Sequence, residues 1–290
     1  MNFPRPDLTR PRTRPGFFRA LVLGLATGLA ACDRPAPSPG AAPDPAREIR
    51  DLITALTPPP ATAIPVLKSE FFSNKKAALE RLRLASAAHG LEALRVYREE
   101  RPALPEVRCG LLDIAAHTNP PATEELLVKL TVTFGEDLYV RKQAARLLGI
   151  SAPIRAIDVL EPILREKVDD RTYPPEESLL DAWLTAYETL ELDPIPLLAL
   201  VATDIKRPMD VRHAATKALG RHPSPLSRQA LETILVESSG NGYIRRLALQ
   251  SLSASLAREE FCALALRVQD READTEFVMV LQDHLDKSCR

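Results

Sequence analysis

The stretch VRHAATKALG, residues 211–220, decides the fold of this chain because it recurs at regular intervals along the sequence. Gapless alignment finds three close copies: VRCGLLDIAA from residue 107, VRKQAARLLG from 140 and IRRLALQSLS from 244. The first two of these starts lie 33 residues apart, as do 211 and 244. Steps of 33 then reach more divergent windows from Asn74, Ser178 and Phe277. Only the step from 140 to 178 differs, at 38 residues, so the chain holds seven copies of one unit.

Each window has the pattern of a helix buried on one face. Positions 1, 5 and 9 are apolar or small, as in Val140, Ala144 and Leu148, and this spacing follows one side of an α-helix. A leucine-rich amphipathic segment precedes each window from residue 107 on, for example LSRQALETILVES before residue 244. The repeating unit is therefore predicted to be a helical hairpin whose second helix contains the window.

Boundary signals and composition agree with this prediction. Asp137 and Asp210 stand just before two of the second helices, and Gly149 and Gly220 stand near their ends. Aromatic residues make up only 5% of a chain that is 45% hydrophobic, so Ala and Leu dominate the apolar set. Such a core suits close-packed helices better than a β-sandwich. We expect an all-α fold.

The windows resemble the HEAT repeat in its short, bilin-lyase-type form, which reads D-x-x-V-R-x-x-A-x-x-A-L-G. MDVRHAATKALGRH (209–222) is the closest copy and DLYVRKQAARLLGI (137–150) the next. Ankyrin and tetratricopeptide signatures are missing from the sequence. The resemblance covers about residues 60–290 and implies a right-handed α-solenoid of about seven hairpins. Copies four and seven depart from it, with Leu179 and Val278 where the arginine should stand.

The N-terminal segment has the features of a secretory signal. Five arginines and one aspartate in the first nineteen residues precede a short apolar run over residues 20–31. Twelve residues span only about 18 Å as a helix, too short to cross a hydrocarbon core of about 30 Å. LAAC, residues 29–32, resembles a bacterial lipobox, which implies that Cys32 is acylated, palmitate included, after removal of residues 1–31. The alternative is an ordinary signal with a chance cysteine.

The lipobox resemblance implies a location in the cell envelope, and the residues after Cys32 are consistent with a tether there. Residues 32–46 contain five prolines and are expected to be an extended tether, followed by the helical domain at 47–290. The resemblance implies a lipid anchor facing the periplasm, and Asp33 resembles a signal for retention at the inner membrane. Removing residues 1–31 leaves 33 basic and 38 acidic residues, a net charge of −5, which argues against a nucleic-acid partner.

No catalytic motif stands out. Iron-binding hydroxylases that resemble this fold need His-Glu pairs, but none of the five histidines (His89, His117, His213, His222, His284) is followed by Glu. The sequence has no Cys-x-x-Cys, no G-x-S-x-G and no phosphate-binding loop. We therefore expect a protein that is not an enzyme and needs no cofactor or metal.

Arginine recurs at position 2 of the windows, and two interpretations of this column stay open. It could be a basic strip that binds a ligand. It could also be an internal ladder, in which each guanidinium binds acids or helix-end carbonyls of a neighbouring unit; this second interpretation is favoured because position 2 adjoins the buried position 1. The column comprises Arg108, Arg141, Arg212 and Arg245, with Lys75 in the first unit.

A binding surface is expected on the second helices, because the resemblance implies that they form the concave wall of the solenoid. Positions 3, 7 and 10 should face out from this wall, and they are mostly polar or small. Copy four instead places apolar residues there, beside the only tryptophan. These residues form either a partner interface or, if the insertion in this copy rotates the helix, part of the core. The candidates are Leu180, Trp183, Leu184 and Tyr187, flanked by Lys142, Arg146, His213 and Lys217, with Tyr173 at the rim.

The sequence thus predicts a membrane-tethered, non-catalytic scaffold that binds a protein or peptide partner. The alternative is an accessory enzyme or lyase-like factor with a small-ligand pocket in the concave groove. In the last unit, Cys262 near the start of one helix and Cys289 after the end of the next could meet in a disulfide, or both could stay reduced. Cys109 is expected to be a free thiol on the wall.

Overall fold

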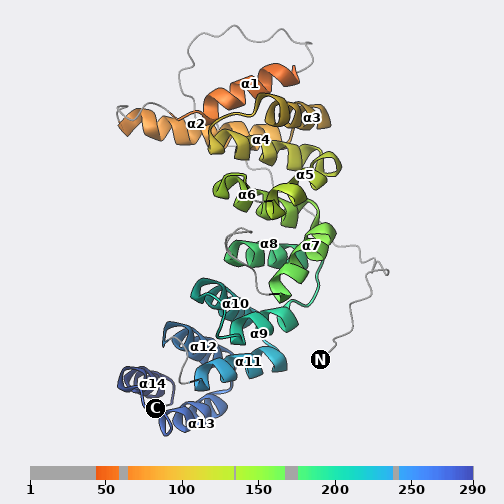
Figure 1. Ribbon diagram of the computed structural model, residues 1–290. Helices are drawn as coiled ribbons and strands as arrows, with labels where there is room; N and C mark the ends of the chain where they lie inside the picture. The colour runs from red at the N-terminus through yellow and green to blue at the C-terminus, as the bar shows by residue number, and fades with distance from the viewer. Residues whose placement is uncertain (1–43, 59–64, 134, 167–175, 238–241, 290) are drawn as a thin grey trace, which may run out of the picture. The chain divides into compact units, whose positions relative to one another are not determined.

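Helical hairpins follow one another along the chain, and every predicted window lies in the second helix of a hairpin (Figure 1). The computed structural model describes residues 44–58, 65–133, 135–166, 176–237 and 242–289. Over these residues the chain forms fourteen α-helices and one π-helical turn, with no strand. The prediction of an all-α fold is confirmed for this part of the chain.

The helices form two rows, which we name by their numbering. The even row contains the second helices: α2 (Pro65–Arg83), α4 (Pro105–Thr118), α6 (Leu138–Ser151), α8 (Glu176–Thr189), α10 (Met209–Arg221), α12 (Gly242–Ser255) and α14 (Thr275–Ser288). The odd row contains the first helices: α1 (Pro45–Leu56), α3 (Ala87–Arg95) with the π-helical turn η1 (Val96–Glu100), α5 (Pro120–Val132), α7 (Pro153–Arg165), α9 (Ile195–Thr203), α11 (Pro225–Val236) and α13 (Arg258–Gln269). Each even-row helix packs against the next, from α2 to α14, and against the odd-row helix before it.

The predicted apolar positions hold the two rows together. Val140, Ala144 and Leu148 of α6 are all fully buried, and the equivalent positions of α10 are buried to the same extent. Burying one Val or Leu side chain stabilises a fold by about 1.5–3 kcal/mol. The helical period read from the sequence therefore marks the core-facing side of these helices.

Of the predicted helix-boundary signals, Asp137 acts as expected, whereas Asp210 and Gly149 do not. Asp137 is the N-cap of α6, as predicted, because its carboxylate accepts the backbone N–H of Tyr139 at 2.9 Å. Asp210 instead lies in the first turn of α10, which Pro208 precedes as N-cap. Gly149 lies inside α6, where a Cβ atom would collide with the backbone carbonyl of Ala182 in α8. This glycine therefore permits close helix packing rather than ending the helix.

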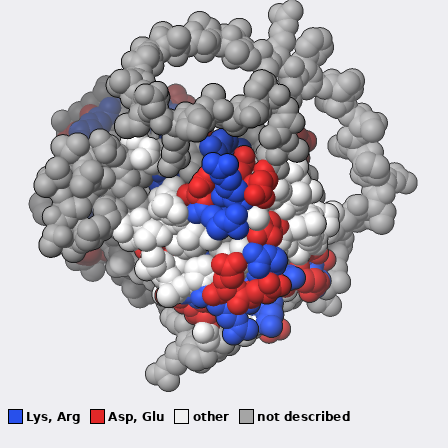
Figure 2. Space-filling view, turned by 90° about the horizontal axis from the view of Figure 1, so that it is seen from above, with Lys and Arg blue, Asp and Glu red and all other residues white. Residues whose placement is uncertain are grey.

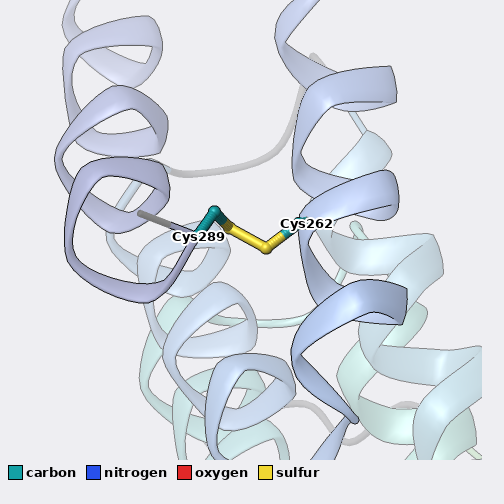
Figure 3. Close-up of a disulfide and its surroundings, with 2 residues drawn as sticks. All are labelled: Cys262 and Cys289. Atoms are coloured by element: carbon teal, nitrogen blue, oxygen red, sulfur yellow. A yellow bond between two sulfur atoms is a disulfide. The ribbon is translucent and has the colours of Figure 1, made fainter.

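A disulfide closes the last hairpin. It joins Cys262 of α13 to Cys289, the residue after α14, with the two Cα atoms 5.9 Å apart (Figure 3). Cross-linking residues at this separation stabilises a fold by about 3–4 kcal/mol in the chain-entropy estimate. The contribution falls on the terminal hairpin, which packs against a neighbour on one side only. Cys109 is a buried free thiol in α4, and burial raises its pKa to about 12.

The predicted signal segment and Cys32 lie outside the described residues. The described helices belong to one compact unit, Pro43–Arg290. Helix α1 begins at Pro45 with Asp44 as its N-cap, so the last two residues assigned to the tether are helical. Within the described ranges, no helix combines the length and apolar character needed to cross a bilayer.

Candidate interaction surface

The apolar residues of copy four belong to the core, so of the two interpretations left open the packing one holds and they are not candidates for a partner-binding wall. Leu180 is 1% exposed, Trp183 0%, and Leu184 and Tyr187 6% each. Helix α8 packs against α6, α7 and α10, so these side chains do not reach solvent. The Trp183 and Tyr187 rings lie 4.1 Å apart, and the Tyr187 hydroxyl donates to Glu161 Oε2 of α7 at 2.7 Å.

The burial follows from a one-residue shift in the register of α8 relative to the alignment, which rotates the helix. Ser178, assigned to position 1, is half-buried, whereas Leu179 is fully buried like position 1 of the other copies. With Leu179 at position 1, the four apolar residues occupy positions 2, 5, 6 and 9. These positions are buried in α6, α10 and α12 as well. The insertion is therefore one residue longer than the alignment assumed, and one residue turns a helix by about 100°.

The remaining wall candidates lie on two helices that are not direct neighbours. Lys142 and Arg146 lie on α6, whereas His213 and Lys217 lie on α10, with α8 between the two helices. Arg146 and Lys217 are exposed, and Lys142 and His213 are half-buried. Tyr173 lies outside the described residues.

The repeated arginines form internal contacts, but the helix-end carbonyls that they bind belong to their own hairpins, whereas the pairs Arg245–Glu272 and Arg108–Glu136 reach the next unit. Arg212 donates to the carbonyl of Ala202 at the end of α9, at 3.1 Å. Arg245 donates to the equivalent carbonyl, that of Leu235 in α11, at 3.0 Å. Its guanidinium also pairs with the carboxylate of Glu272 before α14 and lies 3.9 Å from the Phe277 ring centroid.

The other two arginines differ in burial: the side chain of Arg108 is 19% exposed, whereas Arg141 is nearly inaccessible. Arg108 pairs with Glu136, in the loop before α6. Arg141 is 4% exposed, and its burial lowers its pKa. Because Arg141, Arg212 and Arg245 are all nearly inaccessible, this column does not present a basic strip to a ligand.

Arg207 supplies the contact that copy four lacks, and the sequence analysis missed it. Its side chain is 2% exposed and comes from the loop before α10. It pairs with the buried carboxylate of Glu176 and donates to the carbonyl of Leu164, in the last turn of α7, at 2.6 Å. Arg212 and Arg245 each bind a helix-end carbonyl of their own unit. In copy four, such a carbonyl is bound instead by Arg207, which belongs to the next unit. The gap in the arginine column was the signal that could have revealed it.

An exposed apolar edge of the even row was also missed. Tyr139 at the start of α6 is 55% exposed, Met209 at the start of α10 is 53%, and Tyr243 at the start of α12 is 59%. The Tyr243 ring stacks on His213 with centroids 5.0 Å apart. One helix separates successive even-row helices, so these run in the same direction and their first turns lie along one side. We call Tyr139, Met209 and Tyr243 the even-row edge.

The sequence offered a signal for this edge. Tyr139 and Tyr243 both stand immediately before position 1, just outside the aligned window, where Glu106, Asp210 and Glu276 stand in other copies. Large exposed aromatic residues at a position that is acidic in three other copies are a departure from the repeat. Such residues are over-represented at protein interfaces.

Charged side chains of both signs share one face of the described molecule. Figure 2, viewed from the α1 end, shows basic and acidic side chains intermixed on the coloured surface. Among the described residues, no group of three or more His, Cys, Asp and Glu side chains is placed to hold a metal ion.

Comparisons with known proteins assign no family. No protein-family model matches the chain, and a search of curated proteins gave no match. A solved structure, human deoxyhypusine hydroxylase in complex with glycerol, is similar over 83% of this chain and 96% of that chain. The two share 14% sequence identity, with a TM-score of 0.35.

This neighbour corrects one expectation. The sequence predicted a protein that is not an enzyme, whereas the neighbour is a hydroxylase, so the expectation is contradicted and withdrawn. A likeness at this level assigns no activity and no catalytic residue to the present chain.

Proposed function

We propose that this protein is a membrane-tethered interaction scaffold of the bacterial cell envelope, built as a right-handed α-solenoid of HEAT-like repeats. Seven hairpins in chain order, with each even-row helix packed on the next, support the solenoid. The windows' resemblance to the short HEAT repeat supports the repeat type. The lipobox-like LAAC at residues 29–32 supports the anchor.

The partner is a protein or peptide that docks on the even-row edge. The observation that carries this proposal is the exposure of Tyr139 and Tyr243 at the starts of two even-row helices. Tyrosine supplies a large, stiff contact area with one polar end, which suits a protein interface. Met209, between them in chain order, adds an adaptable apolar contact.

Site-specific crosslinking tests the edge. A photoreactive phenylalanine analogue placed at position 139 or 243 in cells is expected to give an adduct of the same mass from both positions. Leu226 and Leu266 are the matched controls, because they are exposed apolar residues of the odd row. Tyr243→Ala is expected to reduce the adduct from position 139 roughly tenfold, since a hot-spot residue contributes about 1–2 kcal/mol or more. Equal adducts from odd-row positions would contradict the proposal.

Removal of Cys32 tests the anchor. Cys32→Ala is expected to abolish palmitate incorporation and to shift the protein from the membrane to the soluble fraction, or to block its maturation. The physical reason is that several acyl chains hold a protein on a bilayer, at about 0.8 kcal/mol per buried methylene, whereas an unmodified tether does not. Cys109→Ala is the matched control and should stay anchored. Palmitate labelling that persists without Cys32 would rule out the lipobox.

A further inference from the structure

A groove of about 730 Å³ lies between η1 and α5. Its apolar lining includes Tyr97 of η1 and Leu126 and Leu130 of α5. Arg98 and Arg101 line it from the η1 side, and Lys129 lines it from α5. All three cations are exposed side chains. The groove therefore combines apolar surface with positive charge on two sides.

The carboxylates that line the groove are already engaged. Glu136 pairs with Arg108 and accepts the Tyr97 hydroxyl at 3.1 Å. Glu125 lies 3.5 Å from Arg155.

The groove is therefore left with an excess of positive charge. Arg98, Arg101 and Lys129 form no ion pair with any carboxylate of the described residues. The buried Nε of Arg108 likewise has no hydrogen-bond acceptor in this part of the chain. Cations gathered in a concave site attract an anionic ligand.

The backbone here adopts a costly conformation that places two of the arginines. The Arg101 N–H bonds to the carbonyl of Val96, five residues earlier, which closes a π-helical turn. Arg101 itself is left-handed, with φ 45° and ψ 64°, a conformation rarely adopted outside glycine and asparagine. π-turns and left-handed residues are frequent at functional sites. Arg95 braces the turn by pairing with Glu99 and Glu100.

We propose that this groove binds an acidic peptide segment of the partner, with its carboxylates on Arg98, Arg101 and Lys129 and an apolar side chain against Tyr97 and Leu126. Guanidinium groups bind carboxylates through paired hydrogen bonds, and the lysine ammonium adds a point charge. The volume is in the range of ligand sites and far exceeds that of a single small anion, and its cations lie on opposite walls. This inference rests on the proposed scaffold function because it gives the chemistry of the partner.

Fluorescence anisotropy with a labelled nine-residue peptide of glutamates, one leucine and one tyrosine tests the groove. The protein used in this measurement is the full mature chain in detergent. Arg98→Gln with Lys129→Gln is expected to weaken binding roughly tenfold or more and to lower its salt dependence. Both side chains are exposed and form no ion pair with the described residues, so the melting curve should not move. A peptide with glutamine in place of glutamate should bind the unmutated protein no more tightly than the glutamate peptide binds the double variant.

The matched control removes the same charge from the even row. Lys217→Gln with Arg246→Gln, both exposed, should leave peptide binding unchanged. Equal weakening by this control would overturn the groove as the site. The proposal would also be overturned if the groove residues were needed for binding to vesicles rich in anionic lipid. It would likewise be overturned if millimolar inorganic phosphate displaced the peptide and the glutamine peptide bound as well as the glutamate peptide. Normal crosslinks at positions 139 and 243 without peptide binding reject the groove alone, whereas peptide binding without those crosslinks rejects the edge.

Discussion

Arg207→Ala is expected to lower the free energy of unfolding by about 3–5 kcal/mol, because it breaks a buried ion pair from one side. The side chains of Arg207 and Glu176 are only 2% and 3% exposed. Without the guanidinium, the Glu176 carboxylate stays buried without a counter-charge, and the Leu164 carbonyl loses its donor. Burial lowers the pKa of Arg207, because removal from water disfavours the charged guanidinium. Urea denaturation followed by circular dichroism at 222 nm measures the loss.

Two further variants separate burial from charge. Glu176→Leu with Arg207→Met is expected to recover most of the lost stability, because apolar side chains of similar volume replace buried ion pairs at little cost. Arg155→Ala is the matched control: its side chain is 41% exposed and it pairs with exposed carboxylates, so its midpoint should shift little. If Arg207→Ala behaved like Arg155→Ala, the pair would not be a buried structural contact.

The repeat made the even row predictable in detail. A 33-residue step and a helical period agree only if each window is the corresponding helix of its own hairpin. All seven windows are helical over the described residues. The arginine column could be assigned to the interior for a related reason. Its members adjoin position 1, whose apolar character shows that this side of the helix faces the core.

The register of α8 could not be fixed by the same reasoning. Ser178, Leu179 and Leu180 are followed by apolar residues in two helical phases, so periodicity alone accepts either position for the insertion. Contacts with α6, α7 and α10 decide the phase, and these come from distant parts of the chain. The Arg207–Glu176 pair is hidden for the same reason, because its partners are 31 residues apart and belong to different units.

The two candidate sites depend on features outside the repeat pattern. Tyr139 and Tyr243 precede the aligned window, where a search for buried positions does not look. The groove depends on a π-helical turn and on one left-handed arginine. A turn widened by a single residue leaves no periodic signal in a segment as short as residues 91–100.

Trp183→Ala is expected to destabilise the fold by about 3–5 kcal/mol, the usual cost of truncating a large buried aromatic residue. Trp183 is fully buried in α8, and its ring lies 4.1 Å from that of Tyr187. Leu180→Glu should also destabilise strongly, because it places a carboxylate at a site that is 1% exposed. Because α8 packs between α6 and α10, the loss of stability should extend to both of these helices.

Substitutions of two exposed tyrosines are the controls that distinguish a core role of Trp183 from a role in partner binding. Tyr139→Ala and Tyr243→Ala, at 55% and 59% exposure, should leave the urea midpoint nearly unchanged while weakening partner capture. Trp183 is the only tryptophan of the chain, so in the unmutated protein its fluorescence reports the unfolding of α8 directly. Hydrogen exchange in the Trp183→Ala variant should rise first in α6, α8 and α10, since stability in stacked repeats depends on contacts between neighbours. A stable Trp183→Ala protein that failed only to bind its partner would instead place this residue on an interface.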